Sequence, residues 1–259
     1  MPFQHLFPLV GAVILLLMVL LWLISLPIKN AGIIDIFWGI GFVIITWLAF
    51  ALTPQGYLPR KLLLGILVTI WGLRLAIHIG IRNLGKPEDF RYANWRAENG
   101  PRWWWFSFFQ VFFLQGFLMW IISAPVIAAM TSGFPAILTP LDWLGTLLWL
   151  AGFLFETIAD AQLRLFKANH SHEGKLLMHG LWKYSRHPNY FGEAVLWWGF
   201  YLIAVAAGRW WTLFSPVVMT FLLTKVSGVA MLEKTMKQKP GYENYMRKTS
   251  AFLPWLPKS

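Results

Sequence analysis

Residues 7–28, FPLVGAVILLLMVLLWLISLPI, form an apolar run that establishes the class of fold. It contains no charged residue and is long enough to cross a bilayer, which takes about 20 apolar residues. The run is too long for the apolar region of a secretory signal peptide, and no small-residue cleavage site follows it. We therefore expect residues 7–28 to form a retained membrane-spanning helix.

Six further apolar stretches follow, at residues 33–53, 60–84, 104–131, 138–166, 189–207 and 210–234. The chain is 58% hydrophobic and 13% charged, whereas a soluble domain carries about 25% charged residues. Because backbone groups in a bilayer must be hydrogen-bonded internally, these stretches predict helices. We expect an all-α, polytopic membrane helix bundle of about seven transmembrane helices, forming one integral membrane domain over residues 1–259 with a cytoplasmic tail at 235–259.

The basic residues predict the topology. Eighteen of the 22 Lys and Arg residues fall on one side of a seven-span arrangement; the other four are Arg60, Lys61, Arg74 and Arg209. The positive-inside rule places the N-terminus outside and the C-terminus in the cytoplasm. The net charge of +11 suits membrane lipids with anionic headgroups. No soluble module remains to bind nucleic acid, and the absence of cysteine excludes disulfides and thiolate metal sites.

Two spans carry ionisable residues spaced four apart, which places them on one helix face. They are Arg74, His78 and Arg82 in one span, and Glu156, Asp160 and Arg164 in the other, with Lys167 one turn further. Ionisable groups inside a membrane are costly and by default indicate function. They indicate either structural ion pairs between helices or a polar pocket entered from the cytoplasm.

A polar knot, YSRHPNYFGE at residues 184–193, precedes an apolar helix. Pro188 suits the first turn of a helix, so Asn189 and Glu193 would occupy its first turns. The free amides at a helix N-terminus favour anions, and Arg186 and His187 stand just before it. The knot predicts either a phosphate-binding entrance or a simple helix cap. We predict no metal site.

Several motifs resemble those of steroid 5-alpha-reductase-related membrane proteins, and most closely the bacterial branch whose function is unassigned. They are SRHPNYFGE and the C-terminal MLEKTMKQKPGYENYMRKTSAFLPWLP, together with DIFWG at 35–39 and RLAIHIGIRNLGKPEDFRY at 74–92. The resemblance covers most of the chain. It implies an all-helical bundle in the bacterial inner membrane that binds NADPH and reduces a C=C bond in a hydrophobic lipid.

The resemblance also assigns cofactor-binding residues, and their surplus of cations suits the 2′-phosphate that distinguishes NADPH from NADH. The predicted set is Arg82, Arg91, Asp160, Arg164, Lys167, Tyr184, Arg186, His187, Asn189 and Tyr190. The match departs from the steroid reductases in two places. Their Gln–Glu pair on the second helix is absent, and His78 is followed by Ile79 rather than Tyr. We therefore expect an apolar unsaturated lipid other than a 3-oxo-steroid.

Reduction of an activated C=C bond also needs a group that stabilises or protonates the developing anion. The catalytic candidates are Asp35, Tyr92 and Glu193. Asp35 is far from cations in the sequence and begins an apolar helix, so burial would keep it a neutral acid; the alternative is a solvated residue at the helix mouth. Tyr92 would perform the same task from a loop, and Glu193 would contact the nicotinamide amide.

The alternatives are lipid methylation and a transport or purely structural role. Isoprenylcysteine carboxyl methyltransferases share an R-H-P-x-Y start to a late helix and a tail with two tyrosines, and they bind S-adenosylmethionine. The stripe of Asp160, Arg164 and Lys167 fits a larger dinucleotide and favours the reductase.

Overall fold

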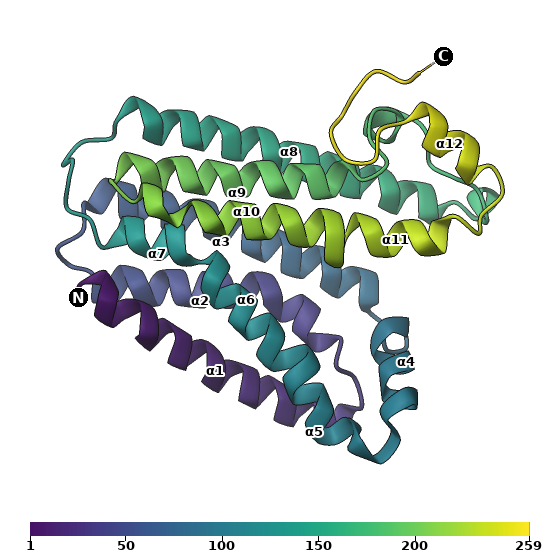
Figure 1. Ribbon diagram of the computed structural model, residues 1–259, viewed down its shortest axis with the longest axis horizontal. Helices are drawn as coiled ribbons and strands as arrows, with labels where there is room; N and C mark the ends of the chain where they lie inside the picture. The colour runs from purple at the N-terminus through teal and green to yellow at the C-terminus, as the bar shows by residue number, and fades with distance from the viewer. Residues whose placement is uncertain (259) are drawn as a thin grey trace. The chain divides into compact units, whose positions relative to one another are not determined.

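The protein is entirely helical. The computed structural model describes residues 1–258, which contain no strand (Figure 1). Six helical segments are long and apolar enough to cross a membrane: Phe3–Ile28, Ile33–Leu52, Leu58–Asn83, Phe90–Ile122, Pro140–Ala168 and Trp210–Met236. These segments confirm the prediction of an all-α polytopic bundle, and the chain is an integral membrane protein.

The predicted span at 189–207 is a special case. It forms helix α9, Pro188–Ala206, but it does not reach the apolar character of the other six. Asn189, Tyr190 and Glu193 in its first turns lower that character. Pro188 is the first residue of α9, as predicted. The seven predicted spans therefore correspond to six strongly apolar segments and the less apolar α9. The N-out, C-in topology stays a prediction.

The chain divides into two compact units. The first comprises Met1–Leu138 with Ala207–Thr212, and the second comprises Thr139–Ala206 with the chain from Leu213 onward. The expectation of one continuous membrane domain stays a prediction. We describe each unit by itself.

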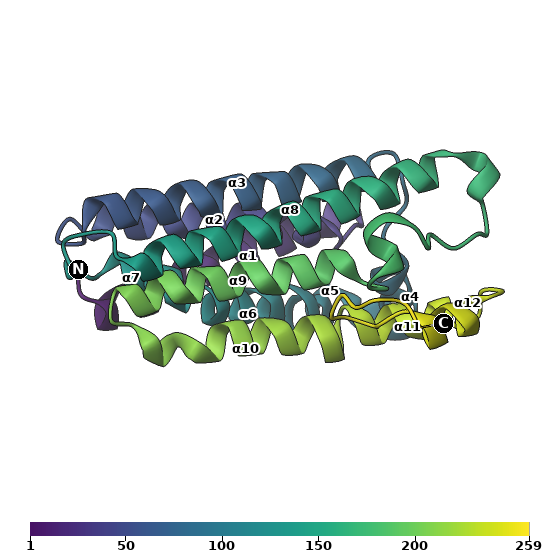
Figure 2. The same ribbon diagram turned by 90° about the horizontal axis from the view of Figure 1, so that it is seen from above.

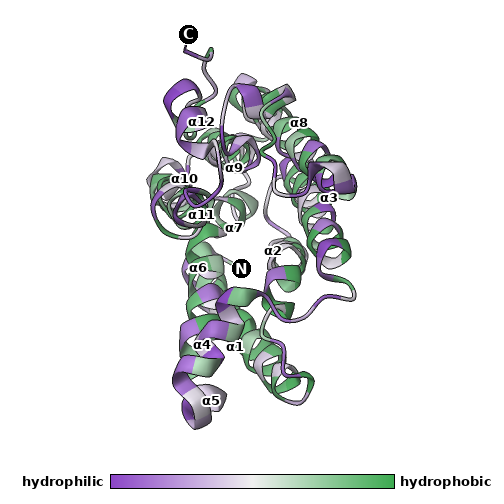
Figure 3. Ribbon diagram, turned by 90° about the vertical axis from the view of Figure 1, so that its right-hand side faces the viewer, coloured by the Kyte–Doolittle hydropathy of each residue, from purple (hydrophilic) through white to green (hydrophobic). Residues whose placement is uncertain are grey.

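The first unit contains three long helices followed by a broken one. The long helices are α1 (Phe3–Ile28), α2 (Ile33–Leu52) and α3 (Leu58–Asn83). The broken helix contains α4 (Phe90–Asn99), α5 (Trp103–Ser107), α6 (Leu114–Ile122) and α7 (Ala124–Met130). A π-helical turn over 108–113 and a break before Pro125 interrupt the span predicted at 104–131. In Figure 3, α1 and α6 are mostly green, as lipid-facing helices should be.

Glycine permits the close approach of α2 and α3, which lie side by side (Figure 2). A Cβ atom at Gly72 would lie 2.5 Å from the carbonyl oxygen of Gly39 and 2.8 Å from Val43 Cγ2. Small residues let membrane helices approach closely, and the contact then stabilises the pair through van der Waals packing. The G-x-G at 39–41 therefore has a packing role at Gly39.

We expect Gly72→Ala to destabilise the first unit by about 1–3 kcal/mol, the usual cost of overpacking. The added methyl group would meet the backbone of α2, which cannot move aside as a flexible side chain would. Thermal unfolding in detergent measures the effect. Gly80→Ala is the matched control, since a Cβ there has nothing within 4 Å. Equal melting temperatures for the two variants would contradict the packing role.

Two cations at the start of α3 are buried. Arg60 is 0% exposed and Lys61 is 4% exposed. Arg60 donates to the carbonyl oxygens of Pro135 and Ile137, and Lys61 donates to the carbonyl oxygen of Thr53 at 2.6 Å. Both residues belong to the predicted outer side, and both are hydrogen-bonded to backbone carbonyl oxygens. The asymmetry of exposed positive charge is therefore larger than the sequence count indicates.

The second unit is built on α8 and α9, which lie side by side (Figures 1 and 2). Its helices are α8 (Pro140–Ala168), α9 (Pro188–Ala206), α10 (Phe214–Phe221), α11 (Val229–Met236) and α12 (Tyr242–Lys248). A capping box of Thr139 and Asp142 begins α8. Gly145 approaches Gly199, and Gly152 approaches Gly192, at distances that leave no room for a Cβ atom. The close contact brings the polar residues of α8 and α9 together.

Candidate functional site

The first unit holds a hydrogen-bonded cluster around Asp35, in the first turn of α2. Arg91 Nη2 lies 2.7 Å from Asp35 Oδ2, and the Tyr92 hydroxyl donates to Asp35 Oδ1 at 2.6 Å. Gln115 Nε2 lies 3.3 Å from the same hydroxyl. Tyr92 is only 2% exposed. The cluster joins an acid, a cation and a phenol within one partly buried network.

Helix α4 is positioned for this contact by the acidic residues that precede it. Asp89 caps α4 and accepts from the Arg91 backbone N–H at 3.0 Å and from Arg91 Nε at 2.8 Å. Burial acts to raise the pKa of Asp89, but these hydrogen bonds outweigh it and hold the pKa below its ordinary value. Glu88 accepts from the backbone N–H of Ala31 at 2.6 Å. The loop is therefore tied to the start of α2 on both sides of Asp89.

The contacts of Asp35 differ from the sequence-based expectation of a neutral acid isolated from cations. Arg91 is distant in sequence, yet the turn before α4 brings its guanidinium against the carboxylate. Asp35 therefore acts as an acceptor that orients the Tyr92 hydroxyl, and Tyr92 becomes the stronger candidate for proton donation.

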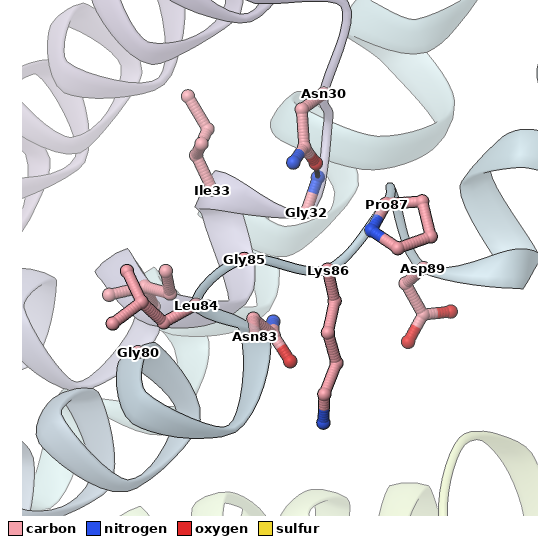
Figure 4. Close-up of a pocket in the computed structure, with 11 residues that line it drawn as sticks. Asn30, Gly32, Ile33, Gly80, Asn83, Leu84, Gly85, Lys86, Pro87 and Asp89 are labelled. Atoms are coloured by element: carbon pink, nitrogen blue, oxygen red, sulfur yellow. Dashed lines mark hydrogen bonds between the residues drawn. The ribbon is translucent and has the colours of Figure 1, made fainter.

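A cavity of about 290 Å³ lies between the start of α2 and the loop that follows α3 (Figure 4). Its lining includes Asn30, Ile33, Asn83, Lys86 and Asp89. Pockets for drug-sized ligands span about 300–1,000 Å³. The cavity is thus too small for a whole dinucleotide and fits one fragment of a ligand. Asp89 joins it to the cluster around Asp35.

The second unit holds a different cluster, centred on Arg186. Its guanidinium is 7% exposed and donates to Glu233 Oε1, through Nε at 2.8 Å and also through Nη2. The same group donates to the carbonyl oxygens of Met246, at 3.1 Å, and Thr249. These contacts attach the α11–α12 segment to the residue pair just before α9.

The neighbouring His187 is buried and neutral. Burial lowers its pKa to about 4; Glu233 opposes this shift and Arg186 adds to it. His187 Nε2 lies 3.4 Å from Glu233 Oε1, and its ring stacks on Tyr190. Burial and the nearby Glu233 carboxylate raise the pKa of Tyr242 to about 12. Both groups are therefore uncharged at neutral pH.

These observations revise the expected phosphate entrance. Arg186 and His187 are predicted to contact a phosphate, but the donors of Arg186 are engaged by Glu233 and by backbone carbonyls, and His187 carries no positive charge at neutral pH. The Arg186 guanidinium pairs instead with the carboxylate of Glu233. Arg186 is thus a residue that holds the tail in place.

A third set of polar residues lies where α8 and α9 meet. Asn189 Nδ2 donates to Asp160 Oδ1 at 3.1 Å, and Asp160 is 7% exposed. Asn189 Oδ1 and Thr157 Oγ1 are buried and have no hydrogen-bond partner among the described residues. Buried polar atoms without partners are rare in proteins and call for an explanation such as an absent ligand. The pairing of Asp160 with Asn189 joins two residues that the sequence assigns to a cofactor.

The other predicted site residues occupy more open positions. Arg164 and Lys167 are exposed in the last turns of α8. Arg82, at the end of α3, is exposed and donates to Asn83. Tyr184 is 37% exposed, and Glu193 is half-buried on α9. Within residues 1–258, no cluster of three acidic or histidine side chains is placed to bind a metal ion.

Four partners of these groups are absent from the sequence-based set: Asp89, Gln115, Glu233 and Tyr242. Asp89 lies in the quoted EDFRY, where its spacing to Arg91 suits a cap. Glu233 and Tyr242 lie in the C-terminal motif, but no local pattern shows that they meet Arg186. Gln115 has no sequence signal, because it is one polar residue in an aromatic helix.

Comparisons with known proteins agree with an unassigned membrane family. The model of the DUF1295 family, described as a protein of unknown function, matches residues 21–249. An uncharacterized protein of Schizosaccharomyces pombe is 27% identical over 266 aligned positions, which cover 91% of this chain and 76% of the yeast protein. No solved structure matches the chain.

Proposed function

The chain belongs to the DUF1295 family, and from this premise we propose that it is an NADPH-dependent oxidoreductase that reduces a C=C bond in a hydrophobic membrane lipid. The family description names no activity. The proposal draws on the resemblance of the SRHPNYFGE and C-terminal motifs to steroid 5-alpha-reductase-related proteins, and on the polar groups of each unit.

The observation that carries the proposal is the buried Asn189–Asp160 pair. The side-chain oxygen of Asn189 is buried without a donor, while its nitrogen is bound to Asp160. An unsatisfied buried acceptor costs about 1–3 kcal/mol, so a ligand N–H that reaches it would recover that energy. A carboxamide such as that of nicotinamide offers such a donor. The residues therefore fit the cofactor at this position.

The exposed cations of α8 suit the phosphate groups of NADPH. Arg164 and Lys167 stand one turn apart in the last turns of the helix, and Lys and Arg both bind phosphate through charge-assisted hydrogen bonds. We assign these two residues, in place of Arg186, to the phosphate groups. When bound, NADPH would supply the hydride.

The proton would come from Tyr92. Its hydroxyl is held between Asp35 and Gln115, and Arg91 forms an ion pair with Asp35. Asp35 is then a positioning residue and Tyr92 the catalytic acid. A buried donor aimed at a developing anion is more effective than one in water, because the surroundings have a lower dielectric constant.

The apolar helices favour a lipid substrate that reaches the site from the membrane, and the resemblance favours the bacterial inner membrane as its location. An unsaturated apolar ketone or a related lipid satisfies the requirement for an activated C=C bond.

The test is a comparison of ligand binding in detergent by calorimetry. We expect NADPH to bind more tightly than NADH and S-adenosylmethionine. Asn189→Ala should weaken NADPH binding by about 1–3 kcal/mol, the cost of unsatisfied buried polar groups, which is a factor of about 5–150.

The matched control is Asn169→Ala, since Asn169 is exposed and its substitution should leave NADPH affinity unchanged. Binding of S-adenosylmethionine without binding of NADPH would reject the reductase and support the lipid methyltransferase. Equal NADPH affinity in the two variants would remove Asn189 from the cofactor site.

A further inference from the structure

The C-terminal segment after α12 carries an exposed apolar surface. Leu253, Trp255 and Leu256 are 63%, 72% and 73% exposed. We call these three side chains the tail surface. Exposed apolar side chains that gather in one segment mark a site of contact with a partner or a membrane.

The tail surface is held in place by its backbone. The Trp255 N–H donates to the carbonyl oxygen of Tyr184 at 3.0 Å, and the Arg186 N–H donates to that of Ser250 at 2.9 Å. The Ser185 hydroxyl donates to the carbonyl oxygen of Phe252 at 2.9 Å. The Phe252 ring packs edge-to-face on Phe191 of α9. These contacts fix one side of the segment and leave the tail surface directed outward.

The segment just before α9, which binds the tail, lies beside α8. The contacts with α8 are made before that helix ends. The Leu181 N–H donates to Gln162 Oε1 at 3.0 Å, and Trp182 Nε1 donates to the carbonyl oxygen of Ala159 at 3.2 Å. Helix α8 continues to Ala168, about 9–14 Å further at 1.5 Å per residue. The tail is therefore anchored at a level that α8 still occupies.

The lipid-exposed side of α8 extends past that level. Ile158 is 46% exposed and Leu165 is 68% exposed, so apolar side chains face outward on both sides of residues 159–162. Figure 1 shows the C-terminal segment near the start of α9, where Phe252 packs on Phe191. In membrane proteins, Trp is enriched at the boundary between the acyl chains and water.

The charges near the tail surface complement lipid headgroups. Residues 247–258 contain Arg247, Lys248 and Lys258 and no acidic residue, and all three cations are exposed. Basic residues next to a membrane surface are each stabilised by about 1 kcal/mol through anionic lipids. Figure 3 shows the hydrophilic character of α12, from which the tail continues.

We propose that Leu253, Trp255 and Leu256 insert into the headgroup–acyl boundary of the bilayer, so that the C-terminal tail lies on the membrane surface. The partner is a lipid bilayer that contains anionic headgroups. Because Arg186 and Ser185 hold the same tail, this contact fixes the depth at which the start of α9 meets water. The inference is independent of the proposed reductase function.

The test uses the natural absence of cysteine. Leu256→Cys in the full chain is labelled with the environment-sensitive dye NBD and reconstituted in vesicles of phosphatidylcholine and phosphatidylglycerol. We expect blue-shifted emission that is quenched by spin-labelled lipids and protected from aqueous iodide. Lys239→Cys, at an exposed position before α12, is the matched control and should be quenched by iodide.

Two outcomes would overturn the proposal. Equal iodide quenching of the two labels would place the tail surface in water. Protection from iodide without quenching by spin-labelled lipid would mean that protein covers the surface, as in contact with a second copy. Each labelled variant must keep the unfolding temperature of the unlabelled protein, and Trp255→Cys repeats the test if Leu256→Cys is unstable.

Discussion

Tyr92→Phe is expected to reduce the rate of lipid reduction by a factor of about 10²–10⁴, the usual contribution of a positioned general acid. The substitution removes only the hydroxyl that donates to Asp35 at 2.6 Å. The ring is 2% exposed and should keep its packing. The affinity for NADPH should stay unchanged, because the hydroxyl acts on the substrate.

The expected chemistry accounts for this loss. Reduction breaks the π bond, with a hydride bonded to one carbon and a proton to the other. In our proposal the Tyr92 O–H bond breaks to supply that proton, and the resulting phenolate takes a proton from water. Arg91, whose guanidinium carbon lies 5.1 Å from the centre of the Tyr92 ring, would stabilise the phenolate. Phenylalanine has no proton to transfer.

Turnover is followed by NADPH absorbance with a panel of apolar α,β-unsaturated ketones in detergent micelles. Tyr57→Phe, before the first turn of α3, is the matched control and should retain full activity. Asp35→Asn should retain NADPH affinity and lose activity, with an altered pH profile, because the neutral amide orients the phenol differently. Full activity of Tyr92→Phe would remove the hydroxyl from the reaction.

Separating Arg186 from Glu233 should produce the largest loss of stability. Their side chains are 7% and 14% exposed, so either Arg186→Met or Glu233→Gln leaves a buried charge without its partner. Breaking a buried ion pair in this way costs about 3–5 kcal/mol. The loss should release the tail, since the same guanidinium binds the carbonyl oxygens of Met246 and Thr249.

Thermal unfolding in detergent and proteolysis of the tail measure this effect. The double variant Arg186→Met/Glu233→Leu should recover part of the stability, because both charges are then removed from the buried site. Lys234→Ala, at the exposed neighbour of Glu233, should change the unfolding free energy by no more than about 0.5 kcal/mol. A loss in Arg186→Met no larger than in this control would show that the pair does not anchor the tail.

Three features of the fold follow from local sequence. Residues 7–28 lie within a membrane helix, Pro188 begins α9, and helices form at every predicted span. Each depends only on the hydropathy or the backbone geometry of residues that are close together in the sequence. The spans at 104–131 and 210–234 are partial exceptions, because a π-helical turn interrupts each of them. Pro125 indicates the second interruption of the span at 104–131, whereas the π-helical turn over 108–113 has no sequence signal.

The candidate site was only partly predictable. The sequence identified Asp35, Tyr92, Asp160 and Asn189 as polar groups of interest, because ionisable and amide residues are costly in apolar helices. It did not determine their partners. The sequence predicts an isolated Asp35, but the turn at Asp89 brings Arg91 against it. It also predicts that Arg186 binds an anion, but the guanidinium pairs with Glu233, which lies 47 residues later.

Hydropathy along the chain was enough to predict a helical membrane protein, the positions of its helices and the polar residues within them. The partners of Asp35, the burial of Arg60 and Lys61 against carbonyl oxygens and the attachment of the tail to residues 184–186 are visible only in the folded chain. The physical reason is that hydropathy is a property of each residue and adds along the chain. A hydrogen bond or ion pair depends on the distance between two atoms, which is defined only when the helices have packed.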